Sequence, residues 1–259
     1  MRFKDQVVVV TGAARGIGFV TAQMAAHEGA LVVLCDLDSA MVEAAVQKIG
    51  GQAIGVTGDV SKLSHVQRNV DEVIKAHGRI DVLVNNAAIT SYHPPELLPE
   101  EVWRHEIDVC LGGTFFWSQS VAVASMIPKR NGAIVNVGSG GSLAALPRCA
   151  AYVAAKHGVV GLTKSLAVDW GQYNIRVNSV CPGLTFTELA KFVASKNPEM
   201  MKKREQRIPL QRGAQPEDVA NAILFLASSQ ASAISGEALS VDGGTLAMSS
   251  GFSAPRDGC

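Results

Sequence analysis

Hydrophobic positions along this chain follow two alternating patterns. Short β-branched runs, apolar with little internal alternation, are typical of parallel strands that are covered on both faces. Longer segments with a helical period fill the gaps between these runs. The predicted strands are Gln6–Val10, Leu31–Cys35, Ala53–Thr57, Asp81–Asn85, Ala133–Val137, Ile175–Val180 and Ala238–Val241. The predicted helices are Gly16–Glu28, Ser39–Ile49, Leu63–His77, Glu100–Met126, Ala151–Trp170 and Pro216–Ser228.

This order of strands and helices predicts the α/β class, with a Rossmann-like doubly wound arrangement. We expect a seven-stranded, mostly parallel sheet with helices on both faces. The length of 259 residues suits one domain that spans residues 1–259, and no linker or repeat divides the chain. Two segments depart from this alternation of strands and helices. Residues 184–215 are expected to form a substrate loop over the carboxyl end of the sheet, and residues 245–259 a C-terminal tail.

Composition excludes several classes of function. The 23 basic and 23 acidic side chains leave no net charge to attract nucleic acid or an anionic membrane surface. No run approaches the roughly 18 apolar residues of a membrane span, and the start of the chain is too short for a signal peptide core. The five cysteines lack metal-binding spacing, so we expect reduced thiols in a cytoplasmic protein and no metal site.

A glycine-rich turn follows the first predicted strand and leads into a helix. It contains Gly12, Gly16 and Gly18 within Thr11–Gly18. Glycines permit a tight turn and a close approach of the backbone to phosphate, and the helix start offers N–H groups to an anion. In this context the turn predicts a dinucleotide phosphate site.

The end of the second strand favours NAD as the cofactor. Asp36 lies eighteen residues after Gly18, where a carboxylate accepts both ribose hydroxyls and repels a 2′-phosphate. Arg15 favours NADP, because its guanidinium could pair with that phosphate. Asp36 is given more weight, so NAD is expected and NADP is the alternative. Asp36 could instead cap the following helix, although Ser39 could take that role.

Tyr152 and Lys156 are four residues apart on a predicted helix and therefore share one face. A nearby ammonium favours the phenolate, so we expect Lys156 to lower the pKa of Tyr152 from about 10 toward working pH. Such a tyrosine can exchange a proton with an alcohol oxygen. Ser139 lies thirteen residues before Tyr152.

Taken together, these motifs resemble the short-chain dehydrogenase/reductase family, over nearly the whole chain from Gln6 to Gly244. The resemblance is carried, in order, by the glycine turn, Asp36, Asn85-Asn86-Ala87, Ser139, Tyr152 with Lys156, and Pro182-Gly183. It implies hydride transfer between NAD and a secondary alcohol or ketone, without a metal. It also implies that Tyr152 is the acid/base, that Ser139 binds the substrate oxygen, and that Lys156 binds the nicotinamide ribose.

The cofactor site predicted from these motifs and from the resemblance extends along most of the chain. Its expected residues are Gly12, Arg15, Gly16, Ile17, Gly18, Asp36, Leu37, Asp59, Val60, Asn86, Tyr152, Lys156, Pro182, Gly183, Thr185 and Thr187.

Two residues depart from the family pattern. Ala88 stands where the family usually has glycine; it is strained only if its φ must be positive, and we expect it to be harmless. Cys110 stands where the family usually has an asparagine that helps to hold a water on the proton path to the lysine. A thiol cannot replace an amide side chain. We expect an active enzyme with a less well-ordered relay, and the rival interpretation is a non-catalytic cofactor-binding scaffold.

The substrate is less well defined than the cofactor. Family analogy places Gly140, Gly141, Arg148 and Phe186 beside it. Arg148 could clamp an anionic group, or it could be a surface residue or a subunit contact. Polyols, sugars, cyclic alcohols and hydroxy acids stay open as substrates, and an NADPH-dependent ketone or 3-oxoacyl reductase is the alternative activity.

The assembly is also expected to follow the family. The predicted helices Glu100–Met126 and Ala151–Trp170 are apolar on more than one face, which is typical of helices covered on several sides. Because the family commonly assembles through the equivalent helices, we expect a homotetramer.

Overall fold

Seven strands form one parallel sheet in this protein, whose computed structural model describes residues 1–188, 190 and 195–249. The strands are β1 (Val7–Thr11), β2 (Leu31–Asp36), β3 (Ile54–Thr57), β4 (Val82–Asn85), β5 (Gly132–Val137), β6 (Ile175–Pro182) and β7 (Ala238–Val241). Their order is β3-β2-β1-β4-β5-β6-β7, and every neighbouring pair is parallel. The predicted doubly wound α/β fold is confirmed, with strand boundaries displaced by at most two residues.

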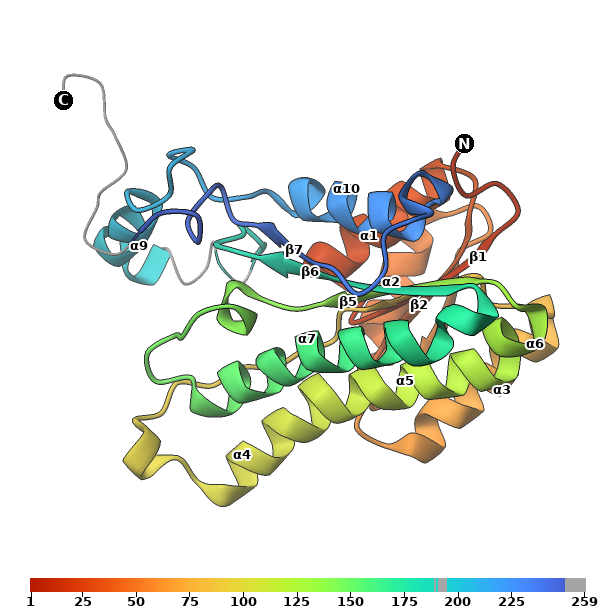
Figure 1. Ribbon diagram of the computed structural model, residues 1–259, viewed down its shortest axis with the longest axis horizontal. Coiled ribbons are helices and arrows are strands. Elements are labelled where there is room, and N and C mark those ends of the chain that lie inside the picture. Colours follow the sequence, from red (N-terminus) through yellow and green to blue (C-terminus); the bar gives the residue numbers. More distant parts are fainter. Residues whose placement is uncertain (189, 191–194, 250–259) are drawn as a thin grey trace.

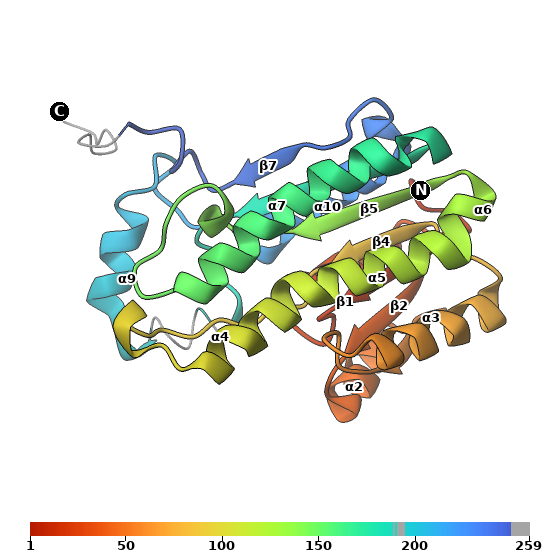
Figure 2. The same cartoon turned by 60° about the horizontal axis from the view of Figure 1, so that its bottom comes forward.

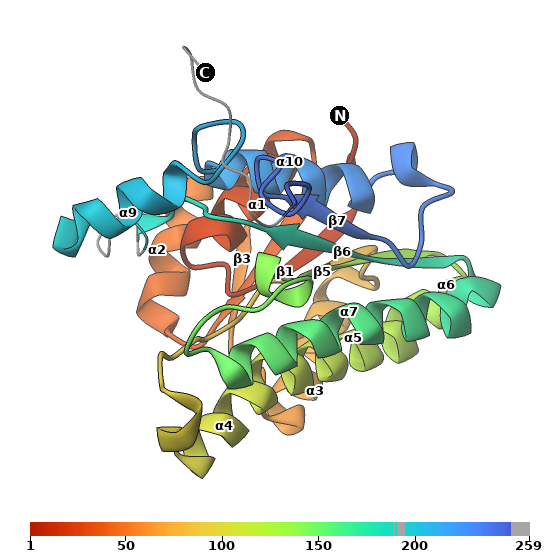
Figure 3. The same cartoon turned by 60° about the vertical axis from the view of Figure 1, so that its left-hand side comes forward.

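Helices cover both faces of this sheet (Figures 1 and 3). The α-helices are α1 (Gly16–His27), α2 (Ser39–Ile49), α3 (Leu63–His77), α4 (Glu100–Ile107), α5 (Gly113–Val121), α6 (Ile127–Lys129), α7 (Ala150–Trp170), α9 (Pro198–Glu205) and α10 (Pro216–Ala227). Short turns of other helix types are η1 (Pro95–Leu97), η2 (Asp108–Gly112), η3 (Ala122–Met126), η4 (Gly140–Ser142), η5 (Gly171–Tyr173) and η6 (Ser229–Ala231).

The strands are apolar throughout because two hydrophobic layers meet on them. All residues of β1, β4 and β5 are buried. On one face, the strands pack against α1, α2 and α10 through residues such as Ala22, Ala45 and Ile223. On the other face, they pack against α3, α5 and α7 through residues such as Val70 and Trp117. This double coverage explains why the sequence shows near-continuous β-branched runs rather than alternation.

The predicted helix Glu100–Met126 is helical from Glu100 to Lys129, but π-helical turns interrupt it at η2 and η3. A π-turn leaves the apolar pattern almost unchanged, so the sequence could not show it. One 18-residue window of this helix reaches a mean hydropathy of 1.2, which corrects the expectation that no stretch approaches a membrane span. Half of that window is buried inside the fold, where Trp117 and Val121 pack on the sheet, as in the core helix of a globular protein.

The cap of α2 differs from the predicted one. Asp38, not Ser39, is the N-cap, and its side chain accepts a hydrogen bond from the Met41 backbone N–H at 3.1 Å. Asp36 is therefore not needed as a cap. At α10, Pro216 occupies the first turn, and Gln215 and Asp218 form a capping box.

The segment 184–215 leaves the carboxyl end of β6 and contains α9. Its two ends are tied together, because Phe186 N–H donates to Ala214 O at 2.8 Å and Thr185 forms a parallel bridge with Ala214. Figure 2 shows α9 beyond the carboxyl ends of the strands, beside the loop between β5 and α7. Its role as a substrate loop stays a prediction. Residues 189 and 191–194 of this segment, and residues 250–259 of the predicted tail, lie outside the described residues.

Candidate active site

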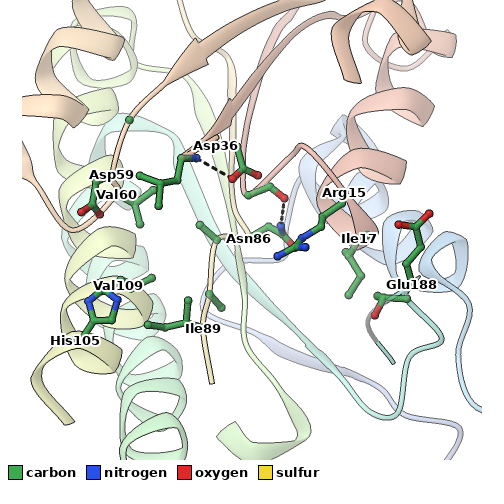
Figure 4. A pocket seen from close by; sticks show the side chains of 17 residues that line it. Arg15, Ile17, Asp36, Asp59, Val60, Asn86, Ile89, His105, Val109 and Glu188 are labelled. Atoms are coloured by element: carbon green, nitrogen blue, oxygen red, sulfur yellow. Dashed lines mark hydrogen bonds between the residues drawn. The ribbon is translucent and has the colours of Figure 1, made fainter. Parts of the chain in front are cut away.

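A cavity of about 420 Å³ opens where β1 separates β2 from β4, at the carboxyl ends of the strands (Figure 4). In doubly wound sheets, ligands bind at this point, where the strand order reverses. The predicted cofactor residues that line the cavity are Gly12, Arg15, Gly16, Ile17, Asp36, Leu37, Asp59, Val60, Asn86 and Thr187.

The glycine turn forms one wall of the cavity, and its three glycines are favoured by backbone angle or by lack of space. Gly12 and Gly16 have φ angles of +62° and +60°, a region that favours glycine. Gly18 lies under the turn, where an added Cβ would lie 2.3 Å from Gly12 O. The Asn86 side-chain amide donates to Thr11 O at 3.0 Å and to Gly12 O at 2.9 Å, and so fixes the turn from below.

Asp36 lies at the end of β2 with its carboxylate held by two backbone groups. Ala14 N–H donates to Oδ2 at 3.0 Å, and Leu37 N–H donates to Oδ1 at 2.8 Å. Each oxygen keeps a free lone pair for a further donor. Figure 4 shows Asp36 and Arg15 at the same cavity, so a carboxylate and a guanidinium both lie at the predicted ribose-binding site.

Asp59 and Val60 lie on the cavity wall beside His105 (Figure 4). Burial tends to raise the pKa of Asp59. Hydrogen bonds from Ser61 N–H at 2.9 Å and Ser61 Oγ at 2.7 Å outweigh it, and they leave that pKa below its ordinary value. The carboxylate is therefore a permanent acceptor next to the cavity.

Ser139, Tyr152 and Lys156 meet between β5 and α7. Ser139 follows β5 as the N-cap of η4, and its Oγ accepts from Gly141 N–H at 3.0 Å. Tyr152, in the first turn of α7, is hydrogen-bonded to the Ser139 side chain. Lys156 is buried one turn later; its Nζ donates to Val137 O at 2.6 Å and lies 5.8 Å from the centroid of the Tyr152 ring.

The expected lowering of the Tyr152 pKa by Lys156 is wrong for this structure. Burial raises the pKa of Tyr152 to about 12, and the hydrogen bond with Ser139 only partly opposes it. Electrostatic interactions with Cys110, Cys149 and Glu106 raise it further. Burial also lowers the pKa of Lys156. Desolvation penalises the charged form of both groups, and the sequence alone could not show how deeply either is buried.

Cys110, at the position of the usual asparagine, is buried in the π-turn η2. Its thiol donates to Ile89 O at 3.3 Å, and Ile89 N–H approaches Sγ at 3.5 Å. Its own carbonyl accepts from Thr114 Oγ1 at 2.8 Å. The other departure is harmless as expected, because Ala88 is not among the non-glycine residues with positive φ in the described chain.

Several predicted residues do not line the cavity itself. Gly18 supports the turn from beneath; Pro182, Gly183 and Thr185 belong to the end of β6 and the segment after it; and Tyr152 and Lys156 lie at the catalytic side. Conversely, the cavity is also lined by residues for which the sequence predicts no cofactor role, namely Gly58, Ala87, Ala88, Ile89, His105, Val109 and Glu188. Gly58 and Ala87 adjoin predicted residues, whereas His105 and Val109 carried no sequence signal because helix rotation decides which residues face the cavity.

The predicted substrate residues are spread over three segments. Gly140 and Gly141 form the turn after Ser139, and Gly141 is buried. Arg148 is exposed with a φ of +62°, and its carbonyl accepts from His93 N–H at 2.9 Å. Phe186 lies at the base of the segment 184–215, where its ring leaves no room for a Cβ on Gly213.

A family model described as enoyl-(acyl carrier protein) reductase matches residues 12–245, and close relatives match almost the whole chain. The chain belongs to the short-chain dehydrogenase/reductase family. It is an oxidoreductase of this family, and the matched residues 12–245 include the glycine turn, Asp36 and the pair Tyr152 and Lys156.

Curated relatives and solved structures show the same family from end to end. The chain is 39% identical to an NAD-dependent glycerol dehydrogenase of Listeria innocua, over 93% of each chain. It is also 39% identical to the 3-oxoacyl-[acyl-carrier-protein] reductase FabG of Thermotoga maritima, over 95% of this chain and all of that one. The crystal structure of gox2181 superposes with a TM-score of 0.92 at 34% identity, over 95% of this chain and 98% of that one.

Proposed function

We propose that this protein oxidises a secondary alcohol to a ketone with NAD, or catalyses the reverse reaction. The observation that carries the proposal is the meeting of Ser139, Tyr152 and Lys156 after β5, at the same carboxyl edge of the sheet as the cavity of the glycine turn. Tyr152 and Ser139 share a hydrogen bond, so a substrate oxygen placed between them would contact both a proton carrier and a hydroxyl. The preference for NAD rests on the Asp36 carboxylate at the end of β2.

The residues present fit a dinucleotide. Gly12 and Gly16 allow the backbone to approach a pyrophosphate at the start of α1, Asp36 would hold a ribose, and Asp59 and Val60 would border the adenine. When bound, the oxidised nicotinamide accepts a hydride, and its positive ring favours a phenolate nearby.

The chain itself handles the proton. In the oxidation, Tyr152 as phenolate takes the proton of the alcohol, while Ser139 Oγ donates a hydrogen bond to the substrate oxygen. Lys156 is buried and anchored to Val137 O, so it stays one helical turn from Tyr152. Because its positive charge is close to the phenol, we propose that it stabilises the phenolate against the burial that otherwise raises the Tyr152 pKa.

A panel of alcohols tests this proposal with NAD and NADP as separate cofactors. The Listeria innocua relative that is named an NAD-dependent glycerol dehydrogenase supports small polyols as the first class to try. Sugars, cyclic alcohols and hydroxy acids follow. Formation of NADH is expected with at least one class, and the same alcohol should react far more slowly with NADP.

The variant Tyr152→Phe should keep NAD binding and lose nearly all turnover, about 10³-fold or more, because the phenol is the proton carrier. Binding is measured by isothermal titration and turnover by NADH absorbance. Tyr173→Phe is the matched control, since Tyr173 lies in η5 at the far end of α7. Residual turnover above a tenth of the wild-type rate would refute the assignment of Tyr152.

An NADPH-dependent ketone or 3-oxoacyl reductase is the second candidate. It is favoured by Arg15, which lines the cavity with Asp36, and by the similarity to a FabG reductase. An NADPH-dependent reductase should show a higher kcat/KM for ketone reduction with NADPH than with NADH, and Arg15→Ala should remove that preference.

A non-catalytic scaffold is the candidate from another class, because Cys110 replaces the usual asparagine. It would be supported if the wild type oxidises no alcohol in the panel while Cys110→Asn does. Wild-type turnover excludes it.

The surroundings of the enzyme are part of the proposal. Cys35, Cys110, Cys149 and Cys181 are buried free thiols, which suits a reducing cytoplasm. Val123 on η3 and Val168 on α7 are 63% and 81% exposed in the single chain, on the two helices expected to form a homotetramer.

A further inference from the structure

One buried carboxyl close to the candidate catalytic residues has no part in the function proposed above. Glu106, in the last turn of α4, is 2% exposed, and its Oε1 atom has no hydrogen-bond partner in the described chain. Burying a carboxylate without partners opposes folding. Such a group in a native structure requires an explanation, and a catalytic role is one of those known for native proteins.

The position of Glu106 connects it to the proton-handling residues. It lies four residues before Cys110 on a helix that packs against α7. Its charge acts on Cys110, and on Cys149 and Tyr152 of the facing helix start. Cys110 and Lys156 also interact electrostatically with each other. Geometry agrees with these interactions, because Glu106 and Cys110 lie one helical turn apart on a helix that packs against α7, which carries Tyr152 and Lys156.

Cys110 cannot relay a proton efficiently on its own. Its thiol and its carbonyl are both engaged, with Ile89 and with Thr114. Burial raises the pKa of the Cys110 thiol, which keeps it protonated and a weak acceptor. A proton that leaves Lys156 toward Cys110 needs a stronger acceptor than this thiol. Glu106 is a carboxyl whose charge acts on both Cys110 and Tyr152.

We propose that Glu106 is a positioning and proton-relay residue that, together with Cys110, replaces the asparagine usual in this family. The inference rests on the proposed alcohol oxidation. There, Tyr152 takes the hydroxyl proton of the substrate, and the hydride leaves with two electrons to the oxidised dinucleotide. Lys156 then gives a proton, by way of a water molecule, to a Glu106 carboxylate oxygen and regains one from Tyr152. Glu106 releases its proton to solvent, so that the phenolate and the carboxylate are both restored.

Glu106→Gln and Glu106→Leu test this relay in the complete enzyme with NAD and the best alcohol of the panel. Both variants should lower kcat about 10- to 100-fold and change KM less than twofold, because they remove a proton acceptor that does not touch the substrate. The solvent deuterium isotope effect on kcat should rise in both. Glu101→Gln is the matched control, since Glu101 is exposed on the first turn of the same helix and should leave kcat unchanged.

Rescue separates a relay from a structural role. If Glu106→Leu lowers kcat a hundredfold, adding Cys110→Asn should raise kcat again at least tenfold. The asparagine usual in the family would then hold the water on the proton path from Lys156. The midpoint of thermal unfolding of Glu106→Leu should stay equal or rise by about 2–4 °C, as an unpartnered buried carboxyl is removed. If Glu106→Leu does not fold, Glu106→Gln carries the test, because it keeps the shape of the side chain.

Three results would overturn the inference. These are a kcat within twofold of wild type in both variants, a loss confined to KM, and a loss without rescue by Cys110→Asn. If the wild type is active, Tyr152→Phe is inactive and the Glu106 variants are unaffected, only the relay fails. An inactive wild type would instead remove the proposed function.

Discussion

Burial and hydrogen bonding act in opposite directions on Tyr152. Desolvation raises its pKa to about 12, and the hydrogen bond with Ser139 lowers it only in part. The phenol of the free protein is therefore protonated at neutral pH, and the phenolate needed for oxidation is a minor form. The proposed function therefore requires that the positive charges of Lys156 and of a bound oxidised nicotinamide stabilise the phenolate.

Alcohol oxidation is therefore expected to speed up with rising pH. A group with a raised pKa is deprotonated only at high pH, so kcat/KM for oxidation should rise from about pH 6 to pH 10, by at most about tenfold per unit. Ketone reduction needs the neutral phenol and should not share this rise. Steady-state rates in both directions across that range provide the measurement. An oxidation rate that is flat or falls with pH would contradict a phenol acting as the base.

Gly18 is expected to tolerate no side chain. In Gly18→Ala the new Cβ would meet Gly12 O at 2.3 Å and Asn86 Nδ2 at 2.6 Å, so the turn must shift. We expect a loss of about 1–3 kcal/mol in the free energy of unfolding and at least tenfold weaker NAD binding. Urea unfolding and isothermal titration measure these two effects.

Gly171→Ala is the matched control for that substitution. Gly171 has nothing within 4 Å of the added Cβ and a φ of −54°, which alanine adopts readily. Its stability and NAD affinity should therefore equal or exceed those of the wild type. Equal behaviour of Gly18→Ala and Gly171→Ala would show that the turn is not close-packed.

Helix ends and helix irregularities position the elements around the cavity. The π-turn η2 carries Val109 to the cofactor cavity and Cys110 to the catalytic side of the same helix. π-turns inside α-helices are frequent at functional sites because they rotate side chains out of the regular order. Asp38 caps α2 two residues after Asp36, so the helix cap and the carboxylate proposed to bind a ribose are different residues.

Replacing Asp38 should destabilise the fold without changing catalysis. Asp38→Ala removes the acceptor for Met41 N–H and should cost about 1 kcal/mol of unfolding free energy. Asp38→Asn keeps a capping oxygen and should stay within about 0.5 kcal/mol of the wild type. Denaturant unfolding measures both, and KM for NAD should change less than twofold. A large rise in that KM with Asp38→Asn would mean that Asp38 also contacts the cofactor.

At the scale of the whole molecule, the parallel sheet fixes where chemistry can occur. The strand order reverses at β1, and all carboxyl ends lie at one edge, so the glycine turn, Asp36 and Asn86 meet there although they are far apart in sequence. The helices on the sheet face that is covered by α3, α5 and α7 also carry exposed apolar residues. Val168 on α7 and Val123 on η3 are the clearest cases, which fits burial between copies of the chain.

The wild type should therefore elute in light scattering near four times its chain mass of 27.2 kDa. Val168→Glu places a charge on a surface that a tetramer would bury and should shift the mass to dimers or monomers. Glu101→Gln, on an exposed position of α4, is the control and should leave the mass unchanged. A monomeric wild type would remove the proposed tetramer.

The local pattern of residues was sufficient to predict much of the fold of this protein. Strand composition and helical period determined the α/β class, the strand boundaries to within two residues and the position of the glycine turn, because each depends on neighbours close in sequence. The i, i+4 spacing placed Tyr152 and Lys156 on one face for the same reason. The resemblance to the short-chain dehydrogenase/reductase family added Ser139, whose hydrogen bond to Tyr152 spans a loop.

Quantities that depend on burial and on helix rotation were decided only by the tertiary structure. The raised pKa of Tyr152, the role of Asp38 in place of Ser39, and the positions of His105 and Val109 at the cavity are of this kind. The same holds for Glu106, which in the sequence is one acidic residue among several polar ones and in the fold is a buried carboxyl whose charge raises the pKa of Tyr152. Desolvation depends on every group that surrounds a side chain, and those groups come from parts of the chain that only folding brings together.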